Sequence, residues 1–156
     1  KETQNAMQIF QNRVRFFDVD AGGITGYKTK LWICRDGIWS AETSSWDNEL
    51  ELTPEQIAIE APFGGGPLIF HVIDKDGFST VGINLPQDVF NDEKGSVSMI
   101  RSNDTEIIPD KEIVLWYQLE MTDGDTWSSD MQNFRESDAK AGLAYTITFT
   151  KDNQTN

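Results

Sequence analysis

The sequence predicts an all-β fold: a single antiparallel β-sandwich of about eight strands with at most one short helix, and a jelly-roll-like strand order fits the same pattern. Three observations predict this. Apolar and polar residues alternate with a period of two, turn residues (Gly, Asp, Asn and Pro) break the alternation at short intervals, and helical periodicity is scarce. A length of 156 residues matches one ordinary domain, so one domain is expected over residues 1–156.

The first expected strand lies in residues 7–19, which contain Val14, Phe16 and Phe17 and lead into the loop sequence DVDAGG at 18–23. A hairpin follows around Asp36-Gly37, since this dipeptide favours a two-residue turn of type I′. That turn places Arg35 opposite Ile38 and Cys34 opposite Trp39. Both faces of the hairpin are then apolar, which is typical of strands covered by a second layer.

A second hairpin is predicted around DKDGFS, with Asp76-Gly77 as the turn. One face is expected to join the core, and it consists of Leu68, Phe70, Val72, Val81, Ile83 and Leu85. The preceding stretch APFGGGP at 61–67 is expected to be a loop. Residues 52–59 (LTPEQIAI) are expected to form a strand, with a helix capped by Thr53 as the alternative.

The most regular strand is predicted at residues 143–150, where every second residue is large and apolar and the residues between them are expected to face solvent. Its expected partner is 112–120, with Ile113, Leu115, Tyr117 and Leu119 on one face. The connection between these strands, 121–142, is long enough to indicate function or local order, and a short helix capped by Ser129 is expected within 130–140.

The formal charge of −13 argues against nucleic acid and against anionic membranes, because both bind through Lys and Arg. No apolar run approaches the roughly 20 residues of a transmembrane segment. Numbering that starts at Lys1 fits a processed chain, so a secreted or cell-surface location is expected. The single cysteine, Cys34, is expected to be a buried structural thiol.

A catalytic site is not expected. His71 is the only histidine, and no Gly-x-Ser-x-Gly elbow presents a nucleophile. One His and one Cys cannot form the usual zinc sites. Glycoside hydrolysis needs only two carboxylates, so a glycosidase is the enzyme class that stays open as a second alternative.

Calcium is the cofactor that the acidic loops suggest, since carboxylates on turns are its usual ligands. Loops from different strand pairs can meet at one end of a sandwich and share an ion. The candidate ligands are Asp18, Asp20, Asp74, Asp76, Asp123 and Asp125. Ordinary Asp-rich turns are the preferred interpretation of the same residues, because Asp is favoured in turns on its own account.

Carbohydrate binding is the leading functional hypothesis. Exposed aromatic rings stack on sugars and neighbouring acids bind hydroxyl groups. Trp46 and Trp127 lie in polar surroundings, and Asp125 and Asp130 flank the second of them. The stretch MTDGDTWSSD at 121–130 is therefore where a site is expected first.

The sequence thus predicts a non-enzymatic binding module for a carbohydrate or similar surface ligand. The alternative is a structural subunit that forms homo-oligomers through its sheet edges and through the N-terminal segment KETQNAMQIF at 1–10.

Overall fold

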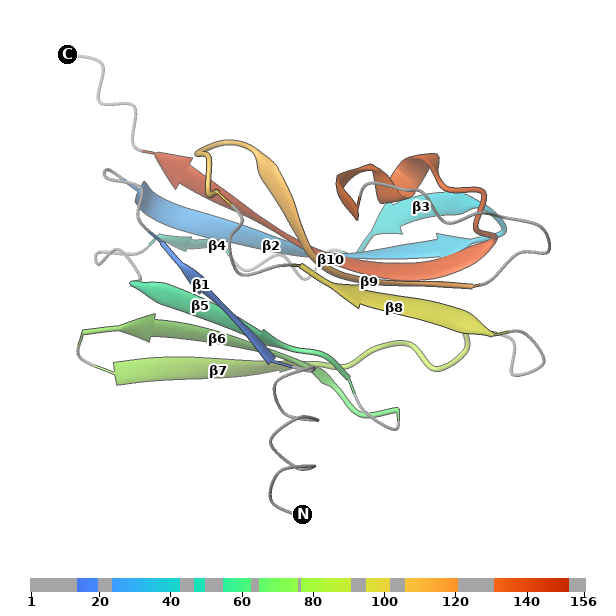
Figure 1. The fold of residues 1–156 in the computed structure, drawn as a ribbon, viewed down its shortest axis with the longest axis horizontal. Coiled ribbons are helices and arrows are strands. Elements are labelled where there is room, and N and C mark those ends of the chain that lie inside the picture. Colours follow the sequence, from blue (N-terminus) through green and yellow to red (C-terminus); the bar gives the residue numbers. More distant parts are fainter. Residues whose placement is uncertain are drawn as a thin grey trace.

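The chain folds as two antiparallel β-sheets stacked face to face, as the computed structural model in Figure 1 shows. The structure describes residues 14–19, 24–42, 47–49, 55–62, 65–75, 77–90, 95–101, 106–120 and 131–151. Within these ranges there are ten strands and one short 3₁₀ helix, η1. The predicted all-β sandwich with at most one short helix is confirmed.

The smaller sheet, here called sheet A, has four strands in the order β1-β5-β6-β7. Their bounds are Val14–Asp18 for β1, Gln56–Glu60 for β5, Leu68–Asp74 for β6 and Gly77–Ile83 for β7. β5 confirms the strand expected in residues 52–59, and the helix alternative is wrong. β1 begins at Val14, so the N-terminal segment 1–10 lies outside the described residues.

The larger sheet, sheet B, has six strands in the order β3-β2-β10-β9-β8, with β4 also paired to β2. Their bounds are Ile24–Arg35 for β2, Ile38–Ala41 for β3, Asp47–Glu49 for β4, Ser96–Ile100 for β8, Glu112–Glu120 for β9 and Ala141–Lys151 for β10. β5-β6-β7 and β8-β9-β10 are meanders, in which consecutive strands pair within one sheet. In a jelly roll most consecutive strands change sheets, so the jelly-roll-like order is not the one observed.

The two predicted hairpins form, with one difference in register. Asp36 and Gly37 both have positive φ, at 53° and 80°, and Arg35 pairs with Ile38 as expected. In the second hairpin Gly77 pairs with Asp74, so the turn comes one residue earlier than Asp76-Gly77. Pairing then shifts by two residues, an even number, so every side chain keeps its predicted face. Val81 does not join the core as predicted, because it lies on the edge strand β7 and is 38% exposed.

The main core lies between the sheets. Phe17, Ile57, Ile59 and Leu68 of sheet A are at most 2% exposed, and they face a row from β10 on sheet B. That row is the predicted one: Leu143, Tyr145, Ile147 and Phe149, all at most 4% exposed. Tyr145 packs against Phe70 of sheet A with ring centroids 5.9 Å apart.

A second, smaller core covers the far side of sheet B. η1, Met131–Glu136, lies on that face in Figure 1 and inserts Phe134, which is 1% exposed. Ala144 and Thr146 of β10 are buried beneath this layer, although the alternation predicted that they face solvent. The expected short helix is therefore confirmed. Because it covers Ala144 and Thr146, the prediction that these residues face solvent is wrong.

Close packing in this smaller core depends on Gly142 at the start of β10. A Cβ atom there would lie 2.8 Å from Cη2 of Trp39 and 2.9 Å from Cδ2 of Leu119. Both distances are shorter than carbon atoms tolerate. The absent side chain thus lets Trp39 close over the sheet.

A β-bulge divides the row predicted on β9. Tyr145 pairs with Trp116 and Thr146 pairs with Val114, so Leu115 has no partner on β10. Beyond the bulge the faces exchange: Ile113, Leu115 and Trp116 pack in the main core, whereas Val114, Tyr117 and Leu119 pack under η1. The prediction that residues 113, 115, 117 and 119 share one face is wrong for this reason.

No helix of the described residues is long and apolar enough to cross a membrane.

Candidate ligand-binding site

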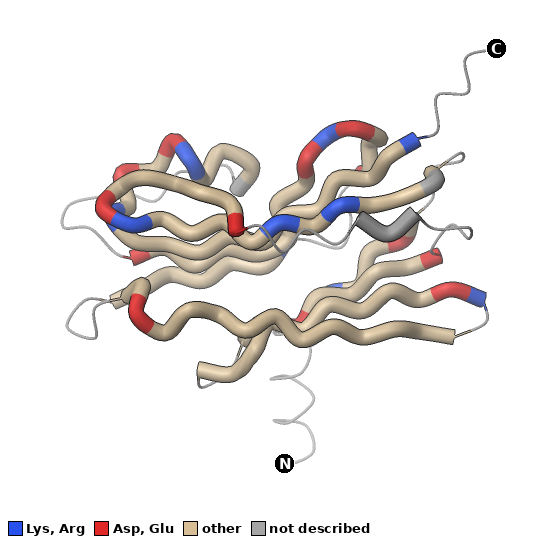
Figure 2. The backbone as a smooth tube through the Cα atoms, turned by 180° about the vertical axis from the view of Figure 1, so that it is seen from behind, with Lys and Arg blue, Asp and Glu red and all other residues tan. Residues whose placement is uncertain are grey.

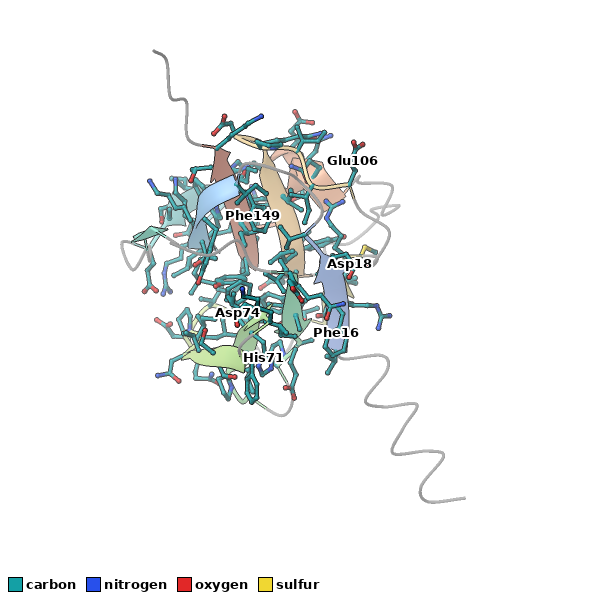
Figure 3. The ribbon with its side chains drawn as sticks, turned by 90° about the vertical axis from the view of Figure 1, so that its left-hand side faces the viewer. Phe16, Asp18, His71, Asp74, Glu106 and Phe149 are labelled. Carbon is teal, nitrogen blue, oxygen red and sulfur yellow. The ribbon has the colours of Figure 1, made fainter. Side chains whose placement is uncertain are left out.

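Two of the predicted calcium ligands, Asp18 and Asp74, lie in described strands, and they face different sides of sheet A. Asp18 ends β1 on the outer face, where the Gln56 side chain donates a hydrogen bond to its Oδ1 at 2.8 Å. Asp74 ends β6 and has the same parity as the inward-facing Val72. Figure 3 shows the two carboxylates on separate strands at this end of the sandwich.

The remaining predicted site residues lie outside the described residues. These are Asp20, Trp46, Asp76, Asp123, Asp125, Trp127 and Asp130. Within the described ranges no group of three or more His, Cys, Asp or Glu side chains could hold a metal ion. The calcium site stays a prediction.

The described residues that flank the acidic stretches 18–23 and 121–130 lie at opposite ends of the sandwich. Five residues, 19–23, separate Asp18 from the start of β2 at Ile24. β9 ends at Glu120, at the same end of sheet B as Arg35, the last residue of β2, with β10 between them. The 12 residues of β2 span roughly 36 Å at about 3.3 Å per residue. The connection 121–130 therefore starts far from Asp18 and Asp74.

A polar hollow of about 440 Å³ lies where β9 ends. Its wall contains five charged residues, and they come from the first hairpin, the segment after β7 and both ends of the long connection: Arg35, Asp36, Asp88, Glu120 and Lys140. Val89 and Phe90 add an apolar surface. The hollow thus adjoins both ends of the connection 121–142, which contains the stretch that the sequence favoured as a site.

An exposed ion pair crosses this hollow. The Arg35 guanidinium donates from Nη1 to Oδ2 and from Nη2 to Oδ1 of Asp88, each at 3.2 Å. This contact holds the pKa of Asp88 below its ordinary value, chiefly through the hydrogen bond from Arg35. Because the two side chains are 51% and 75% exposed, the pair contributes little to stability and is free to meet a ligand.

A second hollow of about 300 Å³ adjoins the first and shares Phe90 with it. Gln87 connects its walls: the amide Nε2 donates to the carbonyl of Gly65 at 3.3 Å and to that of Leu85 at 3.1 Å. Gly65 has φ of +78°, a conformation that favours glycine. The described part of the predicted glycine loop is therefore fixed beside the segment that carries Asp88 and Phe90.

The two nucleophile and base candidates lie elsewhere. Cys34 is fully buried, donates to the carbonyl of Ala139 at 3.5 Å, and has its pKa raised by burial, as expected of a structural thiol. His71 lies on the outer face of sheet A with its Nδ1 2.8 Å from the Thr80 hydroxyl oxygen. Neither residue lines the polar hollow.

Sequence reasoning did not identify Arg35, Asp88, Phe90 or Lys140. Arg35 and Asp88 are 53 positions apart, and their segments meet only after the two sheets have stacked. The sequence NLPQDVF at 84–90 carries a Pro turn signal but no binding motif. The long connection 121–142 was the one signal that indicated this end of the molecule.

Comparison with protein-family models, with curated proteins and with solved structures finds no match to the chain.

Proposed function

We propose that this domain is a non-catalytic binding module for a carbohydrate or a similar polyhydroxylated ligand, and that the polar hollow is its binding site. The observation that carries the proposal is the exposed two-point pair of Arg35 and Asp88 beside Phe90. A volume of about 440 Å³ is within the usual range of small-ligand sites.

The chemistry of this pair suits neighbouring hydroxyl groups. Each sugar hydroxyl both donates and accepts hydrogen bonds. A carboxylate and a guanidinium side by side can therefore accept from and donate to two neighbouring hydroxyl groups. Phe90 is half-buried and offers an apolar surface for the C–H face of a sugar ring. Fixed polar groups around one aromatic ring are the usual composition of such a site.

Asp88→Asn tests the site, because the variant keeps the shape of the side chain and removes its charge. A glycan array first identifies a ligand, and titration calorimetry then measures its dissociation constant. We expect Asp88→Asn to raise that constant at least about tenfold, since a charge-assisted hydrogen bond contributes roughly 1.5–3 kcal/mol. Asp110→Asn is the matched control, because Asp110 is exposed near the opposite end of β10.

Two results would contradict the proposal. One is an array on which no glycan is retained, together with no change in the amide NMR signals of residues 84–90 at millimolar sugar. The other is a ligand whose affinity is the same for wild type, Asp88→Asn and Asp110→Asn, which would place binding elsewhere.

A further inference from the structure

The edge strand β7 presents an open backbone to solvent. Among the strands that the structure describes, β7 pairs with β6 on one side and with none on the other. Every residue from Gly77 to Gly82 is exposed, and the Phe78 side chain is 75% exposed. Its outward N–H and C=O groups therefore form a row that can accept another strand.

β7 lacks the features by which edge strands usually avoid such pairing. Its sequence, GFSTVGI, has no charged residue and no proline, and its ladder with β6 continues without a bulge. Figure 2 shows the strand as an uncharged stretch. The other edge of sheet A, β1, is five residues long and carries Arg15 and Asp18. Length and composition thus single out β7 within this sheet.

We propose that β7 pairs antiparallel with β7 of a second copy of this chain. The two four-stranded sheets would then continue as one sheet across a twofold axis. A symmetric pair of this kind needs only the backbone groups that β7 already exposes, because an antiparallel strand is complementary to itself.

The side chains of β7 suit a pairing centred on Thr80. In that register Phe78 lies opposite Gly82 of the second copy, on the outer face. Gly82 has no side chain to obstruct the ring, and a Cβ there would lie 3.9 Å from Cβ of Pro67, an ordinary van der Waals distance. Ile69 of β6 is the pairing partner of Gly82 and is half-buried. Each exposed Phe78 ring would therefore cover a glycine and an isoleucine of the other copy, a favourable cross-strand arrangement.

Net charge opposes association of two copies, and the uncharged strand β7 is a surface where this repulsion is smallest. Each chain carries a formal charge of −13, so close approach is tolerable only through an uncharged surface. Antiparallel pairing places the charged turn at Asp74 and Lys75 beside the Asn84 end of the other copy, which separates the two turns. Remaining repulsion acts at long range and weakens as salt shortens the Debye length.

The dimer is expected to be weak. A single added strand pair buries less than the roughly 1,200 Å² that standard interfaces require, so dimers should form at about 0.1 mM and above. Sedimentation equilibrium over about 10 µM to 1 mM, in low and high salt, measures the dimer dissociation constant. Wild type should dimerise, and more strongly in high salt.

Ser79→Lys places a charge in the open edge and should raise the dimer dissociation constant at least tenfold. Asn133→Lys is the control, since it makes the same change of charge at an exposed position on η1. A wild-type chain that stays monomeric up to 1 mM would overturn the proposal. Equal association of the two Lys variants would do the same.

Thr80→Cys tests the register directly. In the proposed pair this residue faces its own copy at a Cα separation of about 4.5–5.5 Å, which a disulfide can bridge. With oxidised glutathione as oxidant, Thr80→Cys should form covalent dimers severalfold faster than Thr150→Cys, an exposed control on β10. Native Cys34 is fully buried and adds no background. Equal rates for the two variants would overturn the pairing centred on Thr80.

Discussion

Tyr145 is a buried ionisable residue of the main core whose environment affects stability. It is 4% exposed between the two sheets, and burial raises its pKa to about 12, against an ordinary value of 10.0. A hydrogen bond with Thr29 opposes that shift only in part. The folded chain therefore retains a proton that the unfolded chain releases above about pH 10.

This difference predicts loss of stability at alkaline pH. The contribution of Tyr145 is fully present below pH 10 and disappears as the pH rises through about 12. A shift of that size corresponds to roughly 2–3 kcal/mol. Urea unfolding between pH 9 and 11.5 should show the free energy of unfolding fall more steeply in wild type than in Tyr145→Phe. Cys34, whose pKa is also raised, contributes equally to both proteins. Identical slopes would contradict the assignment.

Single residues were predictable where a local pattern decides their environment. Cys34 lies between apolar neighbours in a hairpin strand, and it is buried as predicted. The pairing of Arg35 with Asp88 has no local signal, because it depends on how a distant segment crosses the end of the sandwich. Binding residues of this kind can be identified only from the folded arrangement of the two sheets.

At the scale of elements, η1 acts as a third layer on sheet B. Phe134 packs edge-on against Trp39, with ring centroids 4.8 Å apart. Arg135 lies over Trp32, 4.1 Å from the ring centroid, and forms an ion pair with Glu112 at 2.8 Å. Gln132 accepts a hydrogen bond from Arg101 at 2.8 Å. These contacts connect η1 to β2, β3, β9 and the residue after β8.

Removing Phe134 should therefore destabilise the domain. Phe134→Ala is expected to lower the free energy of unfolding by about 3–5 kcal/mol, because it leaves a cavity under η1 and exposes the smaller core. Equilibrium urea unfolding measures the loss, and Asn133→Ala, an exposed neighbour, should change it by less than about 0.5 kcal/mol. A loss below about 1 kcal/mol for Phe134→Ala would show that η1 does not stabilise the sheet.

Hairpins and regular strands were predictable because turn residues and period-two alternation are local. The bulge at Leu115 could not be predicted, because it is defined by how β9 pairs with β10. The alternation of apolar residues along β9 gives no sign of it. The burial of Thr146 was also not predicted. A polar residue on an alternating strand predicts a position that faces solvent, and this holds unless another element covers the strand. The cover comes from a connection whose position the pattern does not define.

At the scale of the whole molecule, the sandwich followed from composition, length and turn spacing, whereas the strand order did not. β1 pairs with β5, and β2 pairs with β10, over separations that no sequence pattern encodes. The polar hollow shares this origin, since its walls come from three distant parts of the chain. Fold class was predictable here, and the described site required the assembled sheets.

The net charge of the chain affects the stability of the fold. A formal charge of −13 repels itself within one compact chain, so added salt should stabilise the fold by screening. If salt reduces this repulsion by about 1 kcal/mol, the melting temperature should rise by roughly 2–4 °C for a domain of this size. Melting in increasing NaCl measures this effect at a protein concentration well below that of dimer formation. A melting temperature that does not rise with NaCl would contradict it.

The same experiment separates screening from the calcium site expected of the acidic loops. At equal ionic strength, NaCl, MgCl₂ and CaCl₂ screen the charge to a similar degree, whereas a calcium ion bound only by the folded chain adds its own stabilisation. At about 100 times its dissociation constant, that ion would contribute about 2.7 kcal/mol. Calcium should then raise the melting temperature several degrees beyond magnesium, and EDTA should reverse the rise. If calcium and magnesium give the same curve, the acidic loops hold no calcium-specific site.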